Sequence, residues 1–359
     1  MKRRGRNLIG LCLKVLLIAG LVALLVRAFA GQPVDWAKMG RLFEGGWGWL
    51  AAAQVFIALG LLLTFYRWQV LLKAQEIRYG VLEAFRLGFI GFFFNQFVPG
   101  ATGGDVLKAY YVAVDHPERR AAGVTTVFLD RVIGLLVLIA IAGAALSLNW
   151  DRVSSDPVLR SLTWVVGAGV AGFAVCGGLF FSERCRNHSL VQAMIRRMPL
   201  RDLAGKVQAA VYLYKSHPAL VLWVLAISAA AHSSMAVVAY CYARAMEGGL
   251  EGCPTLGSFF FIVPIAHVAM AIPTGSPGGL GQSELAFGEL FRRIGYGNGL
   301  LLGLIERANW ALWALVGCYF YLRRRGQIRH VLDLEAEAAG REEGGLAPAG
   351  RAETLDTRP

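Results

Sequence analysis

Long apolar stretches, separated by short connections rich in lysine and arginine, dominate this chain. A helix needs about 20 apolar residues to cross a hydrocarbon core about 30 Å thick. Six stretches reach that length, and they occupy residues 8–30, 48–66, 121–148, 161–181, 219–242 and 300–322. The pattern predicts an all-α polytopic membrane protein with about six full transmembrane helices.

Two further apolar regions, residues 81–114 and 257–294, are each too long for one crossing. Clusters of proline and glycine interrupt them at their centres, from Phe94 to Asp105 and from Ile272 to Glu284. Irregular backbone inside a bilayer leaves polar groups unpaired unless protein or a water-filled cavity receives them. We therefore expect two re-entrant helical hairpins, each of which enters to the midplane, turns and leaves on the same side.

The distribution of basic residues predicts the orientation of the chain. Lysine and arginine gather at the N-terminus, in the loop 182–218 and directly after residue 322. Cytoplasmic connections carry an excess of Lys and Arg, so both termini are expected in the cytoplasm. The membrane expected to hold the protein is the inner (plasma) membrane of the cell. Arg67 is assigned to another cytoplasmic connection, whereas the pair Arg292-Arg293 runs against the bias.

With this orientation, the order of spans and hairpins in residues 8–148 repeats, inverted, in residues 161–322. Transporters built from inverted repeats place substrate at the interface between the repeats, near the midplane. The domain organisation predicted is one integral membrane domain, residues 1–330. A disordered cytoplasmic tail rich in Ala, Gly and Glu is expected at residues 331–359.

Two other segments have a specific reading. Residues 28–30 resemble a signal-peptidase site, but the preceding apolar run is longer than the ~7–15 residues typical of a cleaved signal, which favours a retained first helix. The loop 182–218 is expected to form an amphipathic helix on the lipid surface.

Composition narrows the function classes. The chain has 359 residues, is 56% hydrophobic and carries a net charge of +12. Because the basic residues lie between apolar spans, we read them as topology signals and contacts to anionic membrane lipids, not as a nucleic-acid surface. The sequence contains no nucleotide loop, metal-ligand spacing or nucleophile–base set, so no cofactor, no metal and no enzymatic activity are expected.

Ionisable side chains inside the membrane are candidates for function by default. Asp130-Arg131 lies near mid-depth of its span, and Glu306-Arg307 occupies the related span. Adjacent helical residues point ~100° apart, so each of these residues is expected to meet a partner from another element. Contact with substrate or a coupling ion is one reading, and ion pairs that fix helix packing are the other.

The breaks contribute further candidates. Asp105 and Glu284 follow glycine runs where a returning helix begins, and they either cap that helix or recognise a cationic headgroup or a proton. For Glu284 the second reading is favoured, because Ser283 is available as a cap. His232 and His267 are read as isolated core histidines. The other candidates are small or polar: Asn95, Gln96, Gly103, Gly104, Thr274, Ser276, Gly278, Gly279 and Gln282.

These motifs together resemble the transmembrane flippase region of lysylphosphatidylglycerol synthases. The resemblance is carried by Asn95…Pro99-Gly100…Gly103-Gly104-Asp105, Asp130-Arg131 and Pro273…Gly278-Gly279-Leu280-Gly281…Glu284, and covers residues 8–325. The family usually has Glu-Arg where this chain has Asp130-Arg131, so the charge is kept. In full-length relatives a separate soluble domain attaches an amino acid to phosphatidylglycerol; this chain is expected to lack that activity.

The resemblance implies a lipid translocase that moves an anionic, zwitterionic or aminoacylated phospholipid, or a lipid-linked headgroup, between leaflets. Our hypothesis assigns the phosphodiester to Arg131 and Arg307, and a headgroup amine or coupling proton to Asp105 and Glu284. An ion-coupled carrier of a small soluble solute is one alternative. A non-catalytic membrane partner of a lipid-modifying enzyme is another, and homo-oligomerisation is left open.

Overall fold

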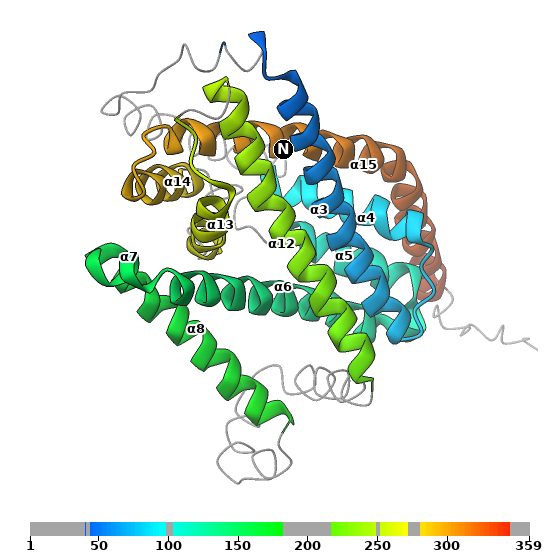
Figure 1. The fold of residues 1–359 in the computed structure, drawn as a ribbon. Coiled ribbons are helices and arrows are strands. Elements are labelled where there is room, and N and C mark those ends of the chain that lie inside the picture. The colour runs from blue at the N-terminus through cyan, green and yellow to red at the C-terminus, as the bar shows by residue number, and fades with distance from the viewer. Residues whose placement is uncertain are drawn as a thin grey trace, which may run out of the picture.

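The computed structural model describes residues 40, 44–97, 103–181, 217–248, 252–271 and 281–344. Within these residues the regular elements are all helices (Figure 1). They are α3 (Trp47–Ala74), α4 (Val81–Phe97), α5 (Gly103–Asp115), the short 3-10 helix η1 (Pro117–Arg119), α6 (Arg120–Leu148), α7 (Trp150–Ser155), α8 (Pro157–Phe181), α12 (Pro218–Glu247), α13 (Leu256–Met270), α14 (Gln282–Arg293) and α15 (Gly299–Gly344).

Five helical segments of the described chain are long and apolar enough to cross a membrane. They correspond to five of the six predicted spans: Trp47–Ala74, Pro117–Leu148, Pro157–Val175, Pro218–Glu247 and Gly299–Arg324. The remaining predicted span, residues 8–30, lies outside the described residues. The prediction of an all-helical, multi-pass membrane protein is confirmed for the part that the structure describes.

Apart from the very short α7 and η1, four described helices are too short to cross a bilayer, and they form two neighbouring pairs. α4 has 17 residues and packs against α5, which has 13. α13 has 15 residues and packs against α14, which has 12. At 1.5 Å per residue the longest of them spans about 26 Å, less than a hydrocarbon core of about 30 Å. Of the predicted breaks, Phe94–Asp105 and Ile272–Glu284, the central residues 98–102 and 272–280 lie outside the described residues.

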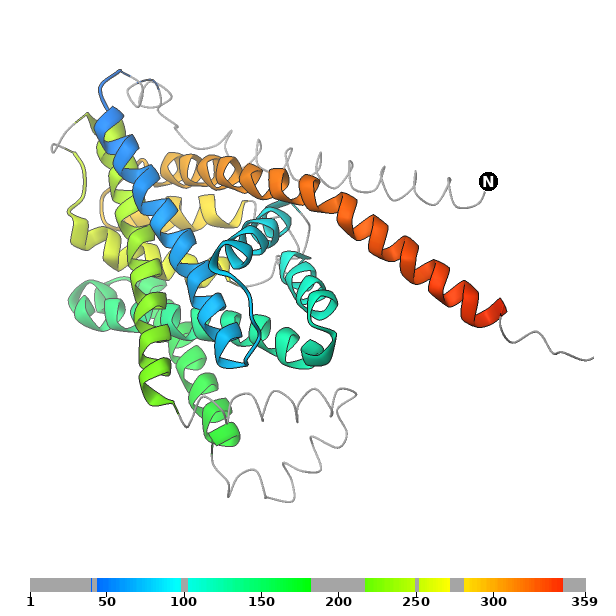
Figure 2. The ribbon, with the colours of Figure 1, turned by 90° about the vertical axis from the view of Figure 1, so that its right-hand side faces the viewer.

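The helices of the two halves pack in matching combinations. α3 and α12 lie side by side over much of their length in both ribbon views (Figures 1 and 2). α4 packs against α15, and α13 packs against α6. The α4–α15 contact is close: a Cβ atom on Gly317 of α15 would lie 2.0 Å from the carbonyl oxygen of Phe89 of α4. Glycine at this position lets the two backbones approach.

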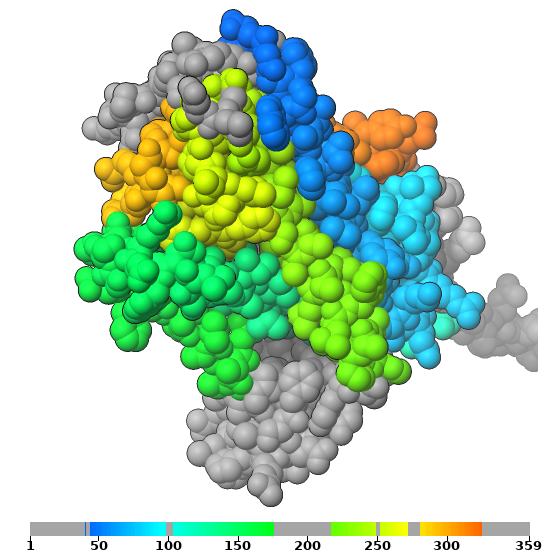
Figure 3. All heavy atoms as spheres, in the orientation of Figure 1, coloured from blue at the N-terminus to red at the C-terminus, as the bar shows by residue number. Residues whose placement is uncertain are grey.

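Apolar side chains form one large core and a smaller one. The large core is formed mainly by α3, α6, α12, α13, α14 and α15, with single residues from α4 and α7 and with Leu159 and Val166 from α8. The smaller core lies where α3, α4 and α5 meet and is centred on Trp68, Leu87 and Tyr111, all fully buried. α8 packs against α6 and α7, but most of its described side chains face outward, and Trp164 is 79% exposed. Figure 3 shows α7 and α8 on the lower left of the molecule. Because α8 is apolar and faces outward, it is suited to contact with the acyl chains of lipids.

The structure differs from the expectation at the C-terminus. α15 continues beyond its membrane-length part to Gly344, where we expected disorder from residue 331 onward. The segment 331–344 is rich in Ala, Glu and Leu, which are strong helix formers, so the helix propagates into it. Residues 345–359 lie outside the described residues, as do residues 182–216, which hold nearly all of the predicted amphipathic helix.

Candidate functional site

The first helix pair presents a carboxylate to the next span. Asp105 lies in the first turn of α5, and Arg131 of α6 reaches both of its oxygens. Nη2 of Arg131 donates to Oδ1 at 3.0 Å, and Nε lies 2.6 Å from Oδ2. The Asp105 side chain is 14% exposed, but that of Arg131 is 55% exposed. Arg131 is therefore held at one edge of its guanidinium and open at the other.

Asp130, the neighbouring residue, turns into the protein and meets a different arginine. Arg67 of α3 donates from Nε to Oδ1 of Asp130 at 2.8 Å and from Nη2 to the Asp130 backbone oxygen at 3.1 Å. Its Nη1 donates to the Ser228 hydroxyl of α12 at 2.7 Å. Lys108 of α5 places Nζ 3.9 Å from Oδ2. One carboxylate thus joins α3, α5 and α6 and faces two cations.

Lys108 and Arg67 occupy shaped surroundings. The Nζ of Lys108 lies 4.0 Å from the ring centroid of Trp68, a cation–π contact that is strong when water is excluded. On α6, a Cβ atom at Gly134 would come within 3.2 Å of the Arg67 guanidinium nitrogens. Glycine at position 134 therefore leaves the room that the buried guanidinium fills.

These contacts agree with one prediction and correct another. Asp130 and Arg131 were expected to meet partners on other elements, and they do. Arg67, however, was assigned to a cytoplasmic connection, whereas α3 extends to Ala74 and the Arg67 side chain is only 6% exposed. Lys108 was not singled out. Its position one turn after Asp105, on the same face of the returning helix, was the available signal.

The second helix pair carries the corresponding carboxylate, Glu284, in the first turn of α14. Glu284 Oε1 forms an ion pair with the Nε of Arg307 of α15. Its Oε2 accepts hydrogen bonds from the backbone N–H of Gly281 at 3.0 Å and from the Ser283 hydroxyl at 2.7 Å. Ser283 also accepts from Nη2 of Arg307 at 2.5 Å. Ser283 therefore binds side chains, and Glu284 itself satisfies an orphan amide of the helix start.

Glu306 precedes Arg307 and turns to other partners. Its Oε1 lies 3.4 Å from Nε2 of His267 of α13 and accepts a hydrogen bond from Nε1 of Trp310 at 3.3 Å. The Glu306 side chain is 5% exposed. His267, read from the sequence as an isolated core histidine, is instead a direct neighbour of a buried carboxylate.

The two halves therefore repeat one arrangement. In each, the arginine of an acid–arginine pair binds the carboxylate that opens the helix after the break: Arg131 to Asp105, and Arg307 to Glu284. The acid of each pair contacts other basic side chains: Asp130 contacts Arg67 and Lys108, and Glu306 contacts His267. A further histidine, His232 of α12, places Nε2 3.0 Å from the Gly134 oxygen and is within electrostatic reach of Arg67 and His267.

The polar residues beside the first break are partly structural. Asn95 of α4 accepts a hydrogen bond at Oδ1 from the backbone N–H of Gly104, at 2.9 Å. A Cβ atom on Gly104 would lie 1.8 Å from the carbonyl oxygen of Gly91, so only glycine allows this contact between α4 and α5. The Gly104 amide is thus occupied and does not offer a free donor to phosphate. Gln96 and Gly103 are half-buried next to it.

The second break is described only at its end. Nε2 of Gln282 donates to the carbonyl oxygen of Ala269 at 2.6 Å and so ties the start of α14 to the end of α13. The other predicted residues of this break lie outside the described residues: Thr274, Ser276, Gly278 and Gly279.

Arginine–carboxylate pairs of this kind suit the binding of charged ligands. A guanidinium is planar and donates two parallel hydrogen bonds, which match a phosphate as well as a carboxylate. Within the described ranges, no three or more His, Cys, Asp or Glu side chains lie together in a group that could bind a metal ion.

Comparison with known protein families places these elements in context. Residues 11–307 match the family described as the lysylphosphatidylglycerol synthase TM region, and the match includes both helix pairs and both acid–arginine pairs. No curated protein matches the chain. Because the match covers well over half of its 359 residues, this multi-pass membrane protein belongs to the lysylphosphatidylglycerol synthase TM region family.

Proposed function

We propose that the protein is a lipid translocase, a flippase-like secondary transporter that moves a phospholipid or lipid-linked headgroup between leaflets. The family to which it belongs is linked to lipid flipping. The observation that carries the proposal is the repeated pairing of Arg131 with Asp105 and of Arg307 with Glu284. Each pair lies at the start of a helix that follows a break, where a transporter places its substrate.

Arg131 and Arg307 are the proposed ligands of the lipid phosphate. A phosphodiester competes with the carboxylate for the guanidinium, because each is a monoanion with two oxygens that accept the parallel N–H bonds of the arginine fork. Arg131 is 55% exposed and is the side chain that a lipid meets first. Arg307 is 15% exposed and needs its carboxylate partner to be displaced or protonated before it binds phosphate.

Asp105 and Glu284 are released when phosphate takes their arginines. A released carboxylate in a low-dielectric site either binds a cationic headgroup or takes up a proton. The first outcome favours a zwitterionic or aminoacylated lipid, and the second couples transport of an anionic lipid to a proton gradient. The buried Glu306, 3.4 Å from His267, is a second candidate for proton binding.

The architecture that we propose is an inverted repeat of residues 8–148 and 161–322 with two re-entrant hairpins. The matching helix contacts support it, since α4 packs on α15 as α13 packs on α6. The short lengths of α4, α5, α13 and α14 support re-entrance. Rocking of one half against the other, about the α3–α12 contact, would expose the site to each leaflet in turn.

We further propose cytoplasmic termini, residence in the plasma membrane and no enzymatic activity. The one conflict with the positive-inside rule, Arg292-Arg293, is softened by local pairing. Arg293 contacts Asp156 at 2.6 Å, and both arginines contact Glu289. The proposed partners are anionic lipids at the basic connections, and a second copy of the chain or a lipid-modifying enzyme.

Lipid transfer in proteoliposomes tests the proposal. Purified protein is reconstituted with fluorescent phosphatidylglycerol, and transfer is followed by quenching of the outer leaflet. Arg131→Ala is expected to reduce transfer at least tenfold, and Arg131→Lys, which keeps the charge but not the fork, to reduce it less. Arg292→Ala is the matched control, because Arg292 is 67% exposed and contacts only Glu289 among the ion pairs of the described residues.

Two results would overturn the assignment. Transfer by Arg131→Ala at the wild-type rate would remove that arginine from the pathway. Uptake of a water-soluble compound by the wild-type protein, without any movement of lipid, would favour the alternative of a solute carrier.

A further inference from the structure

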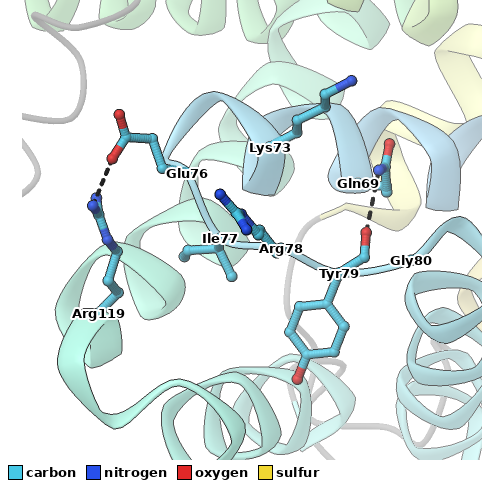
Figure 4. Close-up of a pocket in the computed structure, with 8 residues that line it drawn as sticks. All are labelled: Gln69, Lys73, Glu76, Ile77, Arg78, Tyr79, Gly80 and Arg119. Atoms are coloured by element: carbon cyan, nitrogen blue, oxygen red, sulfur yellow. Dashed lines mark hydrogen bonds and ion pairs between the residues drawn. The ribbon is translucent and has the colours of Figure 1, made fainter.

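A polar pocket lies away from the two ion-pair clusters, where α3 ends and the connection to α4 begins. Its volume is about 790 Å³. Lys73 comes from the last turn of α3, Arg78 from the connection and Arg119 from η1 on the opposite wall (Figure 4). The positive-inside rule assigns this end of α3 to the cytoplasm.

The pocket has an excess of positive charge. Three basic side chains, Lys73, Arg78 and Arg119, share it with one carboxylate, that of Glu76. Nη2 of Arg119 lies 2.5 Å from Oε2 of Glu76, but both side chains are largely exposed, at 49% and 76%. Exposed pairs of this kind contribute little and exchange readily. Lys73 and Arg78 make no ion pair with any other described residue.

Buried side chains and hydrogen bonds fix the backbone of the residues that line the pocket. Ile77 and Tyr79 are buried, and the backbone carbonyl oxygen of Tyr79 accepts a hydrogen bond from Nε2 of Gln69 at 3.3 Å. Nη1 of Arg119 donates to the Gln75 oxygen at 3.2 Å, which fixes the opposite wall to the end of α3. The cationic side chains therefore extend from a preorganised frame, which lowers the entropic cost of binding a ligand.

Glu76 adds a second unusual feature. Its φ is 56°, the only positive φ of a residue other than glycine within the described ranges. This left-handed conformation ends α3 in a Schellman motif, in which the backbone N–H of Glu76 donates to the Lys73 carbonyl oxygen and that of Ile77 donates to the Leu72 carbonyl oxygen, both at 3.0 Å. The motif fixes the position of Glu76, which is the one carboxylate among the residues that line the pocket.

We propose that this pocket binds a phosphate group with two negative charges, a phosphomonoester, between Lys73, Arg78 and Arg119. Three cations against one carboxylate leave a local charge that matches a dianion. Arginine supplies parallel donors to phosphate oxygens, and lysine supplies a mobile point charge. The volume, about 790 Å³, is within the range of ligand sites and leaves room for a ligand larger than phosphate alone.

A phosphomonoester reaches this pocket either as the headgroup of a membrane lipid or as a soluble metabolite. Binding is measured by thermal unfolding of the purified protein in detergent, with three probes: inorganic phosphate, glycerol 3-phosphate and short-chain phosphatidic acid. Phosphatidylcholine of the same chain length is the control lipid. A shift with phosphatidic acid alone assigns the site to a lipid, and a shift with glycerol 3-phosphate assigns it to a soluble ligand.

Two variants with opposite expected effects guard against simple loss of fold. Arg78→Ala removes a charged hydrogen-bond donor and is expected to weaken binding about tenfold. Glu76→Gln removes the competing carboxylate and frees Arg119, so it is expected to strengthen binding several-fold. The proposal is overturned if the wild-type protein binds none of the probes, or if both variants change the affinity in the same direction.

This inference stands apart from lipid translocation. Arg131→Ala is expected to stop transfer yet leave phosphate binding in the pocket unchanged. Failure of either experiment therefore leaves the other interpretable.

Discussion

Arg307 and Glu284 form an ion pair in which the carboxylate is 1% exposed and the guanidinium 15% exposed. The corresponding pair of the first half is far more open, because Arg131 is 55% exposed. The same pairing thus occurs in two environments. Removing the arginine of a buried pair leaves an uncompensated carboxylate in a low dielectric. That carboxylate is 1% exposed in the case of Glu284 and 14% exposed in the case of Asp105, which keeps some access to solvent.

The two arginines should therefore differ in their effect on stability. We expect Arg307→Ala to lower the free energy of unfolding by about 3–5 kcal/mol, the range found when a buried pair loses one partner. Arg131→Ala is expected to cost less than Arg307→Ala, because Asp105 is more exposed than Glu284 and Arg131 itself is half-exposed. Thermal unfolding in detergent measures both. The double variant Glu284→Ala/Arg307→Ala should recover part of the loss, and equal effects of the two single variants would contradict the contrast in burial.

The Arg67–Asp130–Lys108 cluster leads to a second contrast. Asp130 is the carboxylate that pairs with both Arg67 and Lys108, so Asp130→Asn leaves these two buried cations without that counter-charge. We expect that variant to lose about 3–5 kcal/mol of stability. Lys108→Met keeps an unbranched apolar stem against Trp68 and removes the excess cation, so it should be neutral or stabilising. Greater loss from Lys108→Met than from Asp130→Asn, in the same unfolding assay, would refute this account.

Much of the fold followed from the apolar pattern, because spans and breaks are properties of local sequence. The breaks before Gly103 and Gln282 were expected from proline and glycine alone. The pairing of acid–arginine residues with partners elsewhere followed from helix geometry, since neighbours on a helix point about 100° apart.

The identity of those partners could not be read locally. Arg67 lies near the end of an apolar stretch and resembles a topology signal, yet α3 continues past it and tertiary packing buries it against Asp130. The contact between His267 and Glu306 depends on the position of α13 relative to α15. Such contacts depend on the relative placement of helices that are distant in sequence, which periodicity does not specify.

Gly104 provides a test of packing at the first break. A methyl group there would lie 1.8 Å from the Gly91 oxygen, a backbone atom that cannot move aside cheaply. We expect Gly104→Ala to destabilise the protein by about 1–3 kcal/mol, as overpacking does. Gly172→Ala in α8 is the matched control, because its added Cβ meets nothing within 4 Å and alanine favours helix. If both substitutions have the same small effect, the α4–α5 contact is looser than described.

Asp156 joins two helix ends outside the membrane-length segments. Its Oδ1 accepts hydrogen bonds from the backbone N–H groups of Val158 and Leu159, at 2.8 and 3.1 Å, and so caps α8. Arg293 at the end of α14 donates to both carboxylate oxygens at 2.7 and 2.6 Å. The Arg293 hydrogen bonds, with a smaller contribution from the capped amides, hold the pKa of Asp156 below its usual value.

This lowered pKa predicts a dependence of stability on pH. A carboxyl group whose pKa is lower in the folded state stabilises the fold above its unfolded-state pKa of about 3.9. That stabilisation disappears as the pH falls through the folded-state pKa, because the neutral acid no longer attracts Arg293. Asp156→Asn retains a capping oxygen but not the charge, so its unfolding temperature should lie below that of the wild type at pH 7. The difference should close as the pH is lowered below about 4, and a difference that stays constant down to pH 3 would assign the effect to something other than the Asp156 charge.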